Sequence, residues 1–377
     1  MAAGCPTKVL IVDDSAVMRS LLRSVVTAAP GLEVAGTAAD GASALNAIDA
    51  LRPGLVLLDV EMPVMDGLVT LRKLRARGCR MPVIMCSALT QRGARVTIEA
   101  LAGGASDYVA KPAGQASREA AIQALTQDLI PKIHALTSGP PTHSQPAFPG
   151  APRMTPVFPL APPSKAEPVS SNPLVVAIGV STGGPAALDV LLPALPGSFP
   201  LPVLIVQHMP EMFTRLFADR LDGRCRLPVH EAAEGDPVRP GAIYIAKGNW
   251  HMEVLAASRI GLPPTLHLSQ GAPENHCRPA VDVLFRSVAA VYGTGVLAVV
   301  LTGMGSDGMM GCRIIRDHGG SVLAQDQASS AVWGMPGAVT NAGLAHKVLP
   351  LNAMAREITR LACRTRGDAR EHREFVV

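Results

Sequence analysis

Two stretches of this sequence alternate short apolar runs with segments of helical period, and a proline-rich segment separates them. The apolar runs have the length of buried strands, and the segments between them have the amphipathic pattern of helices. Strands that alternate with helices favour a parallel sheet covered on both faces. The pattern therefore predicts two doubly wound α/β domains in one chain of 377 residues.

The first domain is expected over residues 1–137 and the second over residues 174–363. The strands of the first are expected at Val9–Val12, Glu33–Thr37, Leu55–Leu58, Val83–Cys86 and Tyr108–Val109, and its helices include Ser15–Ala28, Gly41–Leu51 and Ser117–Leu136. The strands of the second are expected at Leu174–Ile178, Val203–Gln207, Ala242–Ile245, Val296–Leu301 and Ser321–Ala324, and its helices include Ala186–Leu192, Arg278–Tyr292 and Gly308–His318.

Composition sets the boundaries and excludes several classes of protein. Proline-rich residues 138–173 cannot bury a core and predict an extended linker, and the charged residues 364–377 predict a flexible tail. The net charge of +4 is too small to indicate nucleic-acid binding. Seven cysteines without a C-x-x-C pair fit a reducing cytoplasm, and no signal-peptide pattern or long apolar run predicts secretion or membrane insertion.

Acidic side chains meet the predicted strand ends of the first domain. Asp13 and Asp14 follow the first strand and Asp59 follows the third. Because the carboxyl ends of neighbouring parallel strands converge at one edge, these carboxylates should gather around a cation. Oxygen ligands suit Mg²⁺, which leaves room for a phosphate. Ser87 and Lys111 end the fourth and fifth strands, where they can bind phosphoryl oxygens.

These residues lie in motifs that resemble the receiver domains of two-component response regulators. The motifs are Val12-Asp13-Asp14-Ser15, Leu58-Asp59-Val60-Glu61-Met62-Pro63, Ser87-Ala88-Leu89-Thr90 and Lys111-Pro112. The resemblance implies that Asp59 accepts a phosphoryl group from a histidine kinase. It also implies that Asp14 and Asp59 bind Mg²⁺ directly, with Asp13 acting through water, and that Ser87, Tyr108 and Lys111 form the switch set.

A G-x-S-x-G pentapeptide follows the first strand of the second domain. Its central Ser181 lies between glycines that permit a tight strand-to-helix turn, and Pro185 suits the first turn of the helix. Such a turn can also cradle phosphate. The spacing of a dinucleotide-binding loop and the lysine of a P-loop are both missing, which favours a serine nucleophile.

A serine nucleophile needs a base and a group that orients the base. His208 ends the strand Val203–Gln207 and so shares an edge with Ser181. The other candidate bases are His230, His251, His267 and His276. Asp307, in a glycine-rich loop after Val296–Leu301, is the expected orienting carboxylate; the alternatives are a helix N-cap role for Asp307 and Asp326 as a rival.

The second domain resembles the chemotaxis protein-glutamate methylesterases of the CheB family. The matching motifs are Ile178-Gly179-Val180-Ser181-Thr182-Gly183-Gly184-Pro185, Gln207-His208-Met209-Pro210, Asn275-His276, Leu301-Thr302-Gly303-Met304-Gly305-Ser306-Asp307-Gly308 and Val332-Trp333-Gly334-Met335-Pro336-Gly337. The resemblance implies Ser181 as nucleophile, His208 as base, Asp307 as its partner and the Met304 amide as an oxyanion donor, with no cofactor for the ester chemistry.

The resemblance also implies a function. The chain would hydrolyse glutamate γ-methyl esters, and deamidate glutamines, on methyl-accepting chemoreceptors, under control of a receiver domain that covers the catalytic cleft until it is phosphorylated. Two other classes stay open on the sequence: a receiver-controlled hydrolase for a different acyl substrate, and a response regulator with a non-catalytic or DNA-binding output.

Overall fold

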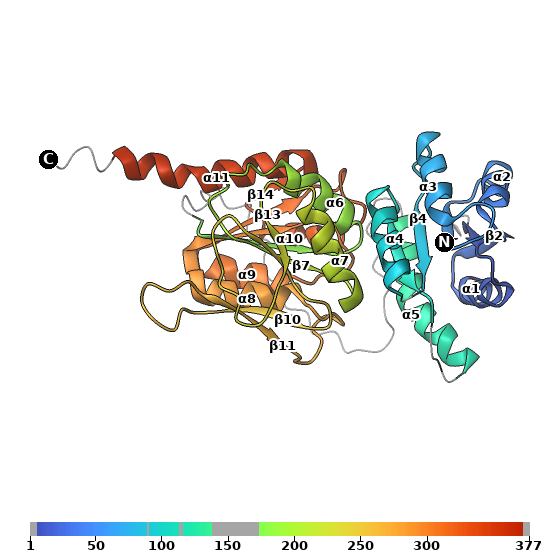
Figure 1. Cartoon of the computed structure of the whole chain (residues 1–377), viewed down its shortest axis with the longest axis horizontal. Coiled ribbons are helices and arrows are strands. Elements are labelled where there is room, and N and C mark those ends of the chain that lie inside the picture. Colours follow the sequence, from blue (N-terminus) through green and yellow to red (C-terminus); the bar gives the residue numbers. More distant parts are fainter. Residues whose placement is uncertain (1–5, 89, 113–114, 116, 138–172, 372–377) are drawn as a thin grey trace, which may run out of the picture.

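Two parallel α/β sheets form the framework of the chain in this computed structural model (Figure 1). The structure describes residues 6–88, 90–112, 115, 117–137 and 173–371. The predicted linker, residues 138–173, lies outside the described residues except for Pro173. No helix among the described residues has the length and apolarity needed to cross a membrane.

The first sheet has five parallel strands in the order β2-β1-β3-β4-β5. Its elements are β1 (Thr7–Val12), α1 (Ala16–Ala28), β2 (Leu32–Ala38), α2 (Gly41–Leu51), β3 (Leu55–Asp59), α3 (Gly67–Ala76), β4 (Val83–Ser87), α4 (Gln91–Ala102), β5 (Asp107–Ala110) and α5 (Arg118–Thr137). Helices α1 and α5 cover one face, and α2, α3 and α4 cover the other. All five predicted strands are therefore confirmed, with ends that differ by one or two residues.

Local sequence sets the ends of these helices. Ser15 accepts a hydrogen bond from Met18 N at the start of α1, and Ser117 accepts one from Ala120 N at the start of α5. Such side-chain caps satisfy backbone N–H groups that a helix cannot pair itself. This cap confirms the predicted start of the last helix of the first domain.

The second sheet has seven parallel strands in the order β14-β13-β12-β6-β7-β9-β8. Its elements are β6 (Val175–Val180), α6 (Gly184–Leu191), β7 (Val203–Gln207), α7 (Glu211–Asp222), β8 (Val229–Glu231), β9 (Ile243–Ile245), α8 (Val281–Tyr292), β12 (Val296–Val300), α9 (Met309–Asp317), β13 (Ser321–Gln325), α10 (Met335–Asn341), β14 (Lys347–Leu349) and α11 (Leu351–Glu371). Short 3₁₀ turns lie at Leu192–Ala194 and Gly293–Gly295.

Two features differ from the sequence prediction. An antiparallel hairpin, β10 (His251–Leu255) and β11 (Thr265–Ser269), lies in a region for which the sequence predicts no strand. Residues 364–371, predicted as part of a flexible tail, continue α11.

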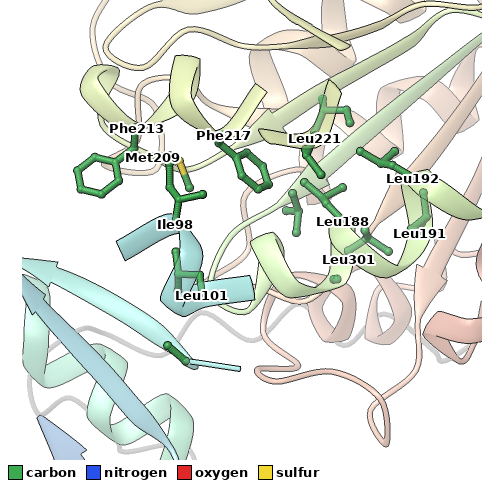
Figure 2. Packing of buried hydrophobic residues seen from close by; sticks show 14 of the residues in the cluster. Ile98, Leu101, Leu188, Leu191, Leu192, Met209, Phe213, Phe217, Leu221 and Leu301 are labelled. Atoms are coloured by element: carbon green, nitrogen blue, oxygen red, sulfur yellow. The ribbon is translucent and has the colours of Figure 1, made fainter. Parts of the chain in front are cut away.

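The two α/β units pack against each other. In Figure 1, α4 of the first unit lies beside α6 and α7 of the second. Figure 2 shows Ile98 of α4 close to Met209, which precedes α7, with Phe213 of α7 on the same side. These side chains are buried in one continuous apolar cluster that spans both units. Burial of this apolar surface holds the units together.

Candidate active site

The G-x-S-x-G segment forms the predicted turn between β6 and α6. Ser181 N donates to Thr302 O (3.0 Å), and Gly184 N donates to Ser181 O (2.8 Å). Gly183 has φ 77°, and a Cβ there would lie 2.5 Å from Ala331 Cβ. Only glycine fits both the left-handed backbone and the close approach, so these glycines are what allow Ser181 to follow the strand directly.

His208 lies beside Ser181 because their strands are paired. Val180 and Gln207 are register partners in β6 and β7, and each is followed by one of the two candidate residues. His208 N also donates to Val180 O at 3.2 Å. Ser181 and His208 therefore lie at the same edge of the sheet, as predicted.

Asp307 reaches the imidazole from the loop after β12. Its Oδ2 lies 2.8 Å from His208 Nε2, and the side chain is 2% exposed. Burial opposes ionisation of Asp307, but the hydrogen bond from His208 and those from backbone amides lower its pKa overall. The rival Asp326 instead accepts from Ser329 N and Oγ within its own turn.

Contrary to the alternative interpretation, Asp307 does not cap the helix that follows it; its side chain bonds backbone amides of another helix. Asp307 Oδ2 accepts from Val281 N (2.7 Å), and its Oδ1 accepts from Asp282 N (3.0 Å). These are the first amides of α8, whereas Gly308 is the N-cap of α9. The carboxylate thus caps a helix distant in sequence, and the positive end of that helix favours its charge.

The remaining candidate histidines lie elsewhere. His230 is exposed in β8, and His267 Nδ1 bonds Glu234 (3.0 Å) on the hairpin. His251 is buried between Ala272 O and the amide of Ala280. His276, in a loop with φ 63°, has no hydrogen bond to Asp307 among the described residues. Of the five histidines, His208 alone pairs with Asp307.

Asn275 and Asp282 complete the surroundings of Asp307, and sequence reasoning assigned neither a role. Asn275 Nδ2 lies 3.1 Å from both Asp282 Oδ2 and Asp307 Oδ1, so one amide bridges two carboxylates. Burial and the nearby Asp307 raise the pKa of Asp282. Asn275 belongs to the motif Asn275-His276, but its position between the two carboxylates depends on the fold and cannot be predicted from the spacing of residues in the sequence.

The loop after β12 lies against Ser181. A Cβ on Gly303 would lie 2.8 Å from Ser181 Cβ, so this backbone abuts the candidate nucleophile. Gly303 N donates to Val332 O, while no hydrogen bond of the described residues uses the N–H of Met304. The N–H of Met304 is therefore available to an oxyanion, the role that the family resemblance implies for it.

The pH dependence of activity follows from the environment of His208. Burial disfavours the imidazolium, but Asp307 and Cys277 stabilise it, and the pKa is raised to about 9. Only the neutral ring can accept the proton of Ser181. We therefore expect kcat/KM to rise with pH and level off above about pH 9. A pH–rate profile on an ester substrate measures this; a plateau already reached at pH 7 would contradict it.

The second site is the acidic cluster of the first sheet. Ligand oxygens of Asp13, Asp14 and Asp59 lie within 4.8 Å of one another. Lys111 Nζ forms ion pairs at 2.7 Å with Asp13 and with Asp59. Burial raises the pKa of Asp59, against the effect of Lys111. Asp59 and Ser87 are the last residues of their strands and not the first residues after them.

The cluster fits a divalent cation that prefers oxygen ligands. Asp13 Oδ2 is buried and, apart from the ion pair, accepts no hydrogen bond of good geometry. A pocket of about 280 Å³ opens beside Asp14, Asp59 and Lys111. Buried carboxylate oxygens next to a pocket of this size suit Mg²⁺ with its waters and a phosphoryl group.

The predicted switch residues are divided between the acidic cluster and the contact between domains. Ser87 is fully buried at the end of β4, and its Oγ donates to Ala88 O at 3.2 Å. Tyr108 points the other way: its ring stacks on Phe213 of α7 with centroids 4.7 Å apart. Lys132 Nζ donates to Tyr108 O (2.7 Å) and lies 5.3 Å from the ring centroid. A change at Lys111 or Ser87 can thus reach the catalytic unit through β5.

A buried hydrogen bond joins the receiver to the nucleophile turn. Thr182 Oγ1 donates to Asp107 Oδ2 at 2.7 Å, and both residues are buried. Thr182 directly follows Ser181. A hydrogen bond to a charged acceptor contributes about 1.5–3 kcal/mol. The receiver is therefore bonded one residue away from the candidate nucleophile, a contact for which the sequence held no signal.

Comparison with known proteins agrees with this architecture. The family model for the response regulator receiver domain matches residues 9–123, and the model for CheB methylesterase matches residues 176–358. A relative from Trichodesmium erythraeum, named protein-glutamate methylesterase/protein-glutamine glutaminase, is 48% identical over 358 residues, 94% of this chain and 98% of its own. One of the same name from Nocardioides is 49% identical over 359 residues, 95% and 96% of the two chains.

A solved structure is also similar. The CheB methylesterase catalytic domain of Thermotoga maritima covers 50% of this chain and 99% of its own, with 40% identity and a TM-score of 0.49. The fold and the two family models define a response regulator whose receiver domain precedes an α/β output domain of hydrolase type. More narrowly, the chain belongs to the CheB methylesterase family.

Proposed function

We propose that this chain is a phosphorylation-activated protein-glutamate methylesterase that also deamidates glutamine side chains. The observation that carries the proposal is the 2.8 Å contact between His208 and Asp307 at the sheet edge where Ser181 follows β6. A hydroxyl, an imidazole and a carboxylate in this order are the parts of a serine hydrolase. The relatives' shared name supplies the substrate class, glutamate methyl esters and glutamine amides of a protein.

The reaction follows from these parts. Ser181 Oγ attacks the ester carbonyl while His208 takes its proton, and Asp307 stabilises the resulting imidazolium. The N–H of Met304 stabilises the oxyanion. Methanol leaves with the proton from His208, and water then hydrolyses the acyl-enzyme by the same steps. A glutamine amide enters the same cycle with ammonia as the leaving group.

Control is assigned to Asp59 as the phosphoryl acceptor. Asp13, Asp14 and Asp59 would hold Mg²⁺, which offsets the charge of the incoming phosphoryl group. A phosphoryl group on Asp59 is expected to attract Lys111 and Ser87 and to change the face of β5 that carries Tyr108. The expected partners are a histidine kinase as phosphodonor and methyl-accepting chemoreceptors as substrate.

The docked arrangement supports inhibition by the unphosphorylated receiver. Asp107 bonds Thr182 beside the nucleophile, and Tyr108 stacks on Phe213. A receptor helix must reach Ser181 from outside, so a receiver held there hinders access. Phosphorylation would weaken these contacts and open the cleft.

Loss of the hydrogen bond between the domains should raise basal activity. Asp107→Ala removes an interaction of about 1.5–3 kcal/mol, and we expect unstimulated methanol release to rise about tenfold or more. The phosphodonor should then stimulate this variant less than the wild type. Asp49→Ala, which alters an exposed carboxylate on the receiver, should change neither value. A folded Asp107→Ala variant with wild-type basal activity would argue against docking as the inhibitory contact.

The function itself is tested by methanol release from a methylated chemoreceptor. We expect release by the full chain, with a higher rate when Mg²⁺ and a small-molecule phosphodonor are present. Hydrolysis of small esters without any release from methylated receptor would instead indicate a different acyl substrate.

A further inference from the structure

Both ring nitrogens of His208 are engaged, and neither by Ser181. Asp307 Oδ2 lies 2.8 Å from Nε2, and Cys277 Sγ lies 3.5 Å from Nδ1. Among the described residues, no hydrogen bond joins Ser181 Oγ to either nitrogen. The nitrogen that faces away from the carboxylate, and that a serine would need, is therefore in contact with a thiol.

The protonation of the ring makes this contact exclusive. A neutral imidazole carries one N–H and one in-plane lone pair. The carboxylate of Asp307 accepts the proton of Nε2, which leaves the lone pair on Nδ1. When the ring is neutral, Cys277 S–H donates to that lone pair, and Ser181 O–H must donate to the same one before it can act as nucleophile. When the ring is charged, Nδ1–H donates to the sulfur instead, which is how Cys277 stabilises the imidazolium. Thiol and hydroxyl are thus alternative partners of one acceptor.

A tight loop holds the thiol in this position. Cys277 N donates to Glu274 O (2.8 Å), and Glu274 N donates to Cys277 O (3.1 Å). Glu274 is itself paired with Arg286 of α8 at 2.8 and 2.5 Å. Within the same loop, Asn275 bonds Asp307. The loop is therefore fixed to the helix that Asp307 caps. As a result, the sulfur of Cys277 and the carboxylate of Asp307 are held in fixed positions on the two sides of the His208 ring.

We propose that Cys277 is a positioning residue that occupies Nδ1 of His208 in the resting enzyme, and that catalysis begins when the hydroxyl of Ser181 replaces the thiol. The inference rests on the proposed function and adds a competing partner to its base. The thiol has no covalent role in it: the proton of S–H stays on sulfur, and the proton of Ser181 passes to the vacated nitrogen.

Removal of the thiol should make the base easier to use. A hydrogen bond contributes about 0.5–1.5 kcal/mol, so Cys277→Ala should raise kcat of the full chain about 2- to 10-fold. It also removes a partner that stabilises the imidazolium, so the acidic limb of the pH–rate profile should move to lower pH by about half a unit. The ionisable groups around the ring are Asp307, which contacts it, and Asp282, which lies behind Asn275.

Two further variants separate this role from simple packing. Cys277→Ser keeps a donor on the same carbon and should stay near or below the wild-type kcat, with the acidic limb unmoved. Cys363→Ala changes an exposed cysteine of α11 and should match the wild type in both readouts. Circular dichroism checks that each variant is folded.

The outcomes distinguish the inference from the function on which it rests. A folded Cys277→Ala variant with unchanged or lower kcat, or with an unmoved acidic limb, overturns the inference. If Ser181→Ala is inactive in the same experiment, the proposed esterase function still stands. Activity retained in Ser181→Ala and lost in Cys277→Ala would overturn both and make the thiol the nucleophile. A faster Cys277→Ala enzyme with an inactive Ser181→Ala enzyme supports both.

Discussion

Replacement of Ser181 by alanine is expected to lower kcat for methanol release by a factor on the order of 10⁵–10⁶. The residues of a nucleophilic trio act as a unit, so removal of the nucleophile leaves only binding and the oxyanion donor. His208, Asp307 and the free amide of Met304 would stay in place because they do not depend on the hydroxyl for their contacts. The loss should therefore appear in kcat with little change in stability.

A matched serine tests the specificity of that loss. Ser258 is exposed, and no described hydrogen bond involves its side chain. Ser258→Ala should keep the wild-type rate in the same assay. Methanol release by Ser181→Ala at more than about a hundredth of the wild-type rate would contradict the assignment, because binding and oxyanion stabilisation alone supply far less.

Replacement of Asp59 by asparagine is expected to abolish stimulation by a phosphodonor while leaving basal activity in place. Asparagine retains the size of the side chain but cannot accept a phosphoryl group. It also removes one of the two carboxylates that pair with Lys111 at 2.7 Å, so the affinity for Mg²⁺ should fall as well. Asp59 forms no hydrogen bond or ion pair with Ser181, His208 or Asp307 among the described residues, so hydrolysis without phosphodonor should continue.

The measurement is methanol release with and without Mg²⁺ and phosphodonor, for the wild type and the variant. Asp49→Asn, at an exposed carboxylate paired with Arg77, provides the control and should respond like the wild type. Stimulation of Asp59→Asn to the wild-type level would place the phosphoryl acceptor elsewhere.

Strand ends explain why much of both candidate sites could be predicted. Parallel strands bring their carboxyl ends to one edge, so a polar residue directly after an apolar run has a defined position. The position of a residue at a strand end therefore predicts that Asp59 and Lys111 meet at the edge of one sheet and that Ser181 and His208 meet at the edge of the other. The family resemblance supplied the roles that position alone does not assign.

Contacts between distant segments explain what was missed. The sequence allows Asp307 to cap the helix that follows it, but in the structure it caps α8, which precedes β12 in the chain. Asp107 begins a strand, far from the end that carries the acidic cluster, and its bond to Thr182 exists only when the domains dock. No local pattern encodes such pairs, because they depend on how whole elements pack.

The most direct test of the account is to identify the residue that acts as the nucleophile. The full chain would be treated with a serine-directed fluorophosphonate, digested, and mapped by mass spectrometry, with Ser181→Ala and Cys277→Ala treated in parallel. The account predicts loss of esterase activity with one adduct on Ser181, retained in Cys277→Ala and absent in Ser181→Ala. An adduct on Cys277, or inactivation with Ser181 unmodified, would contradict it.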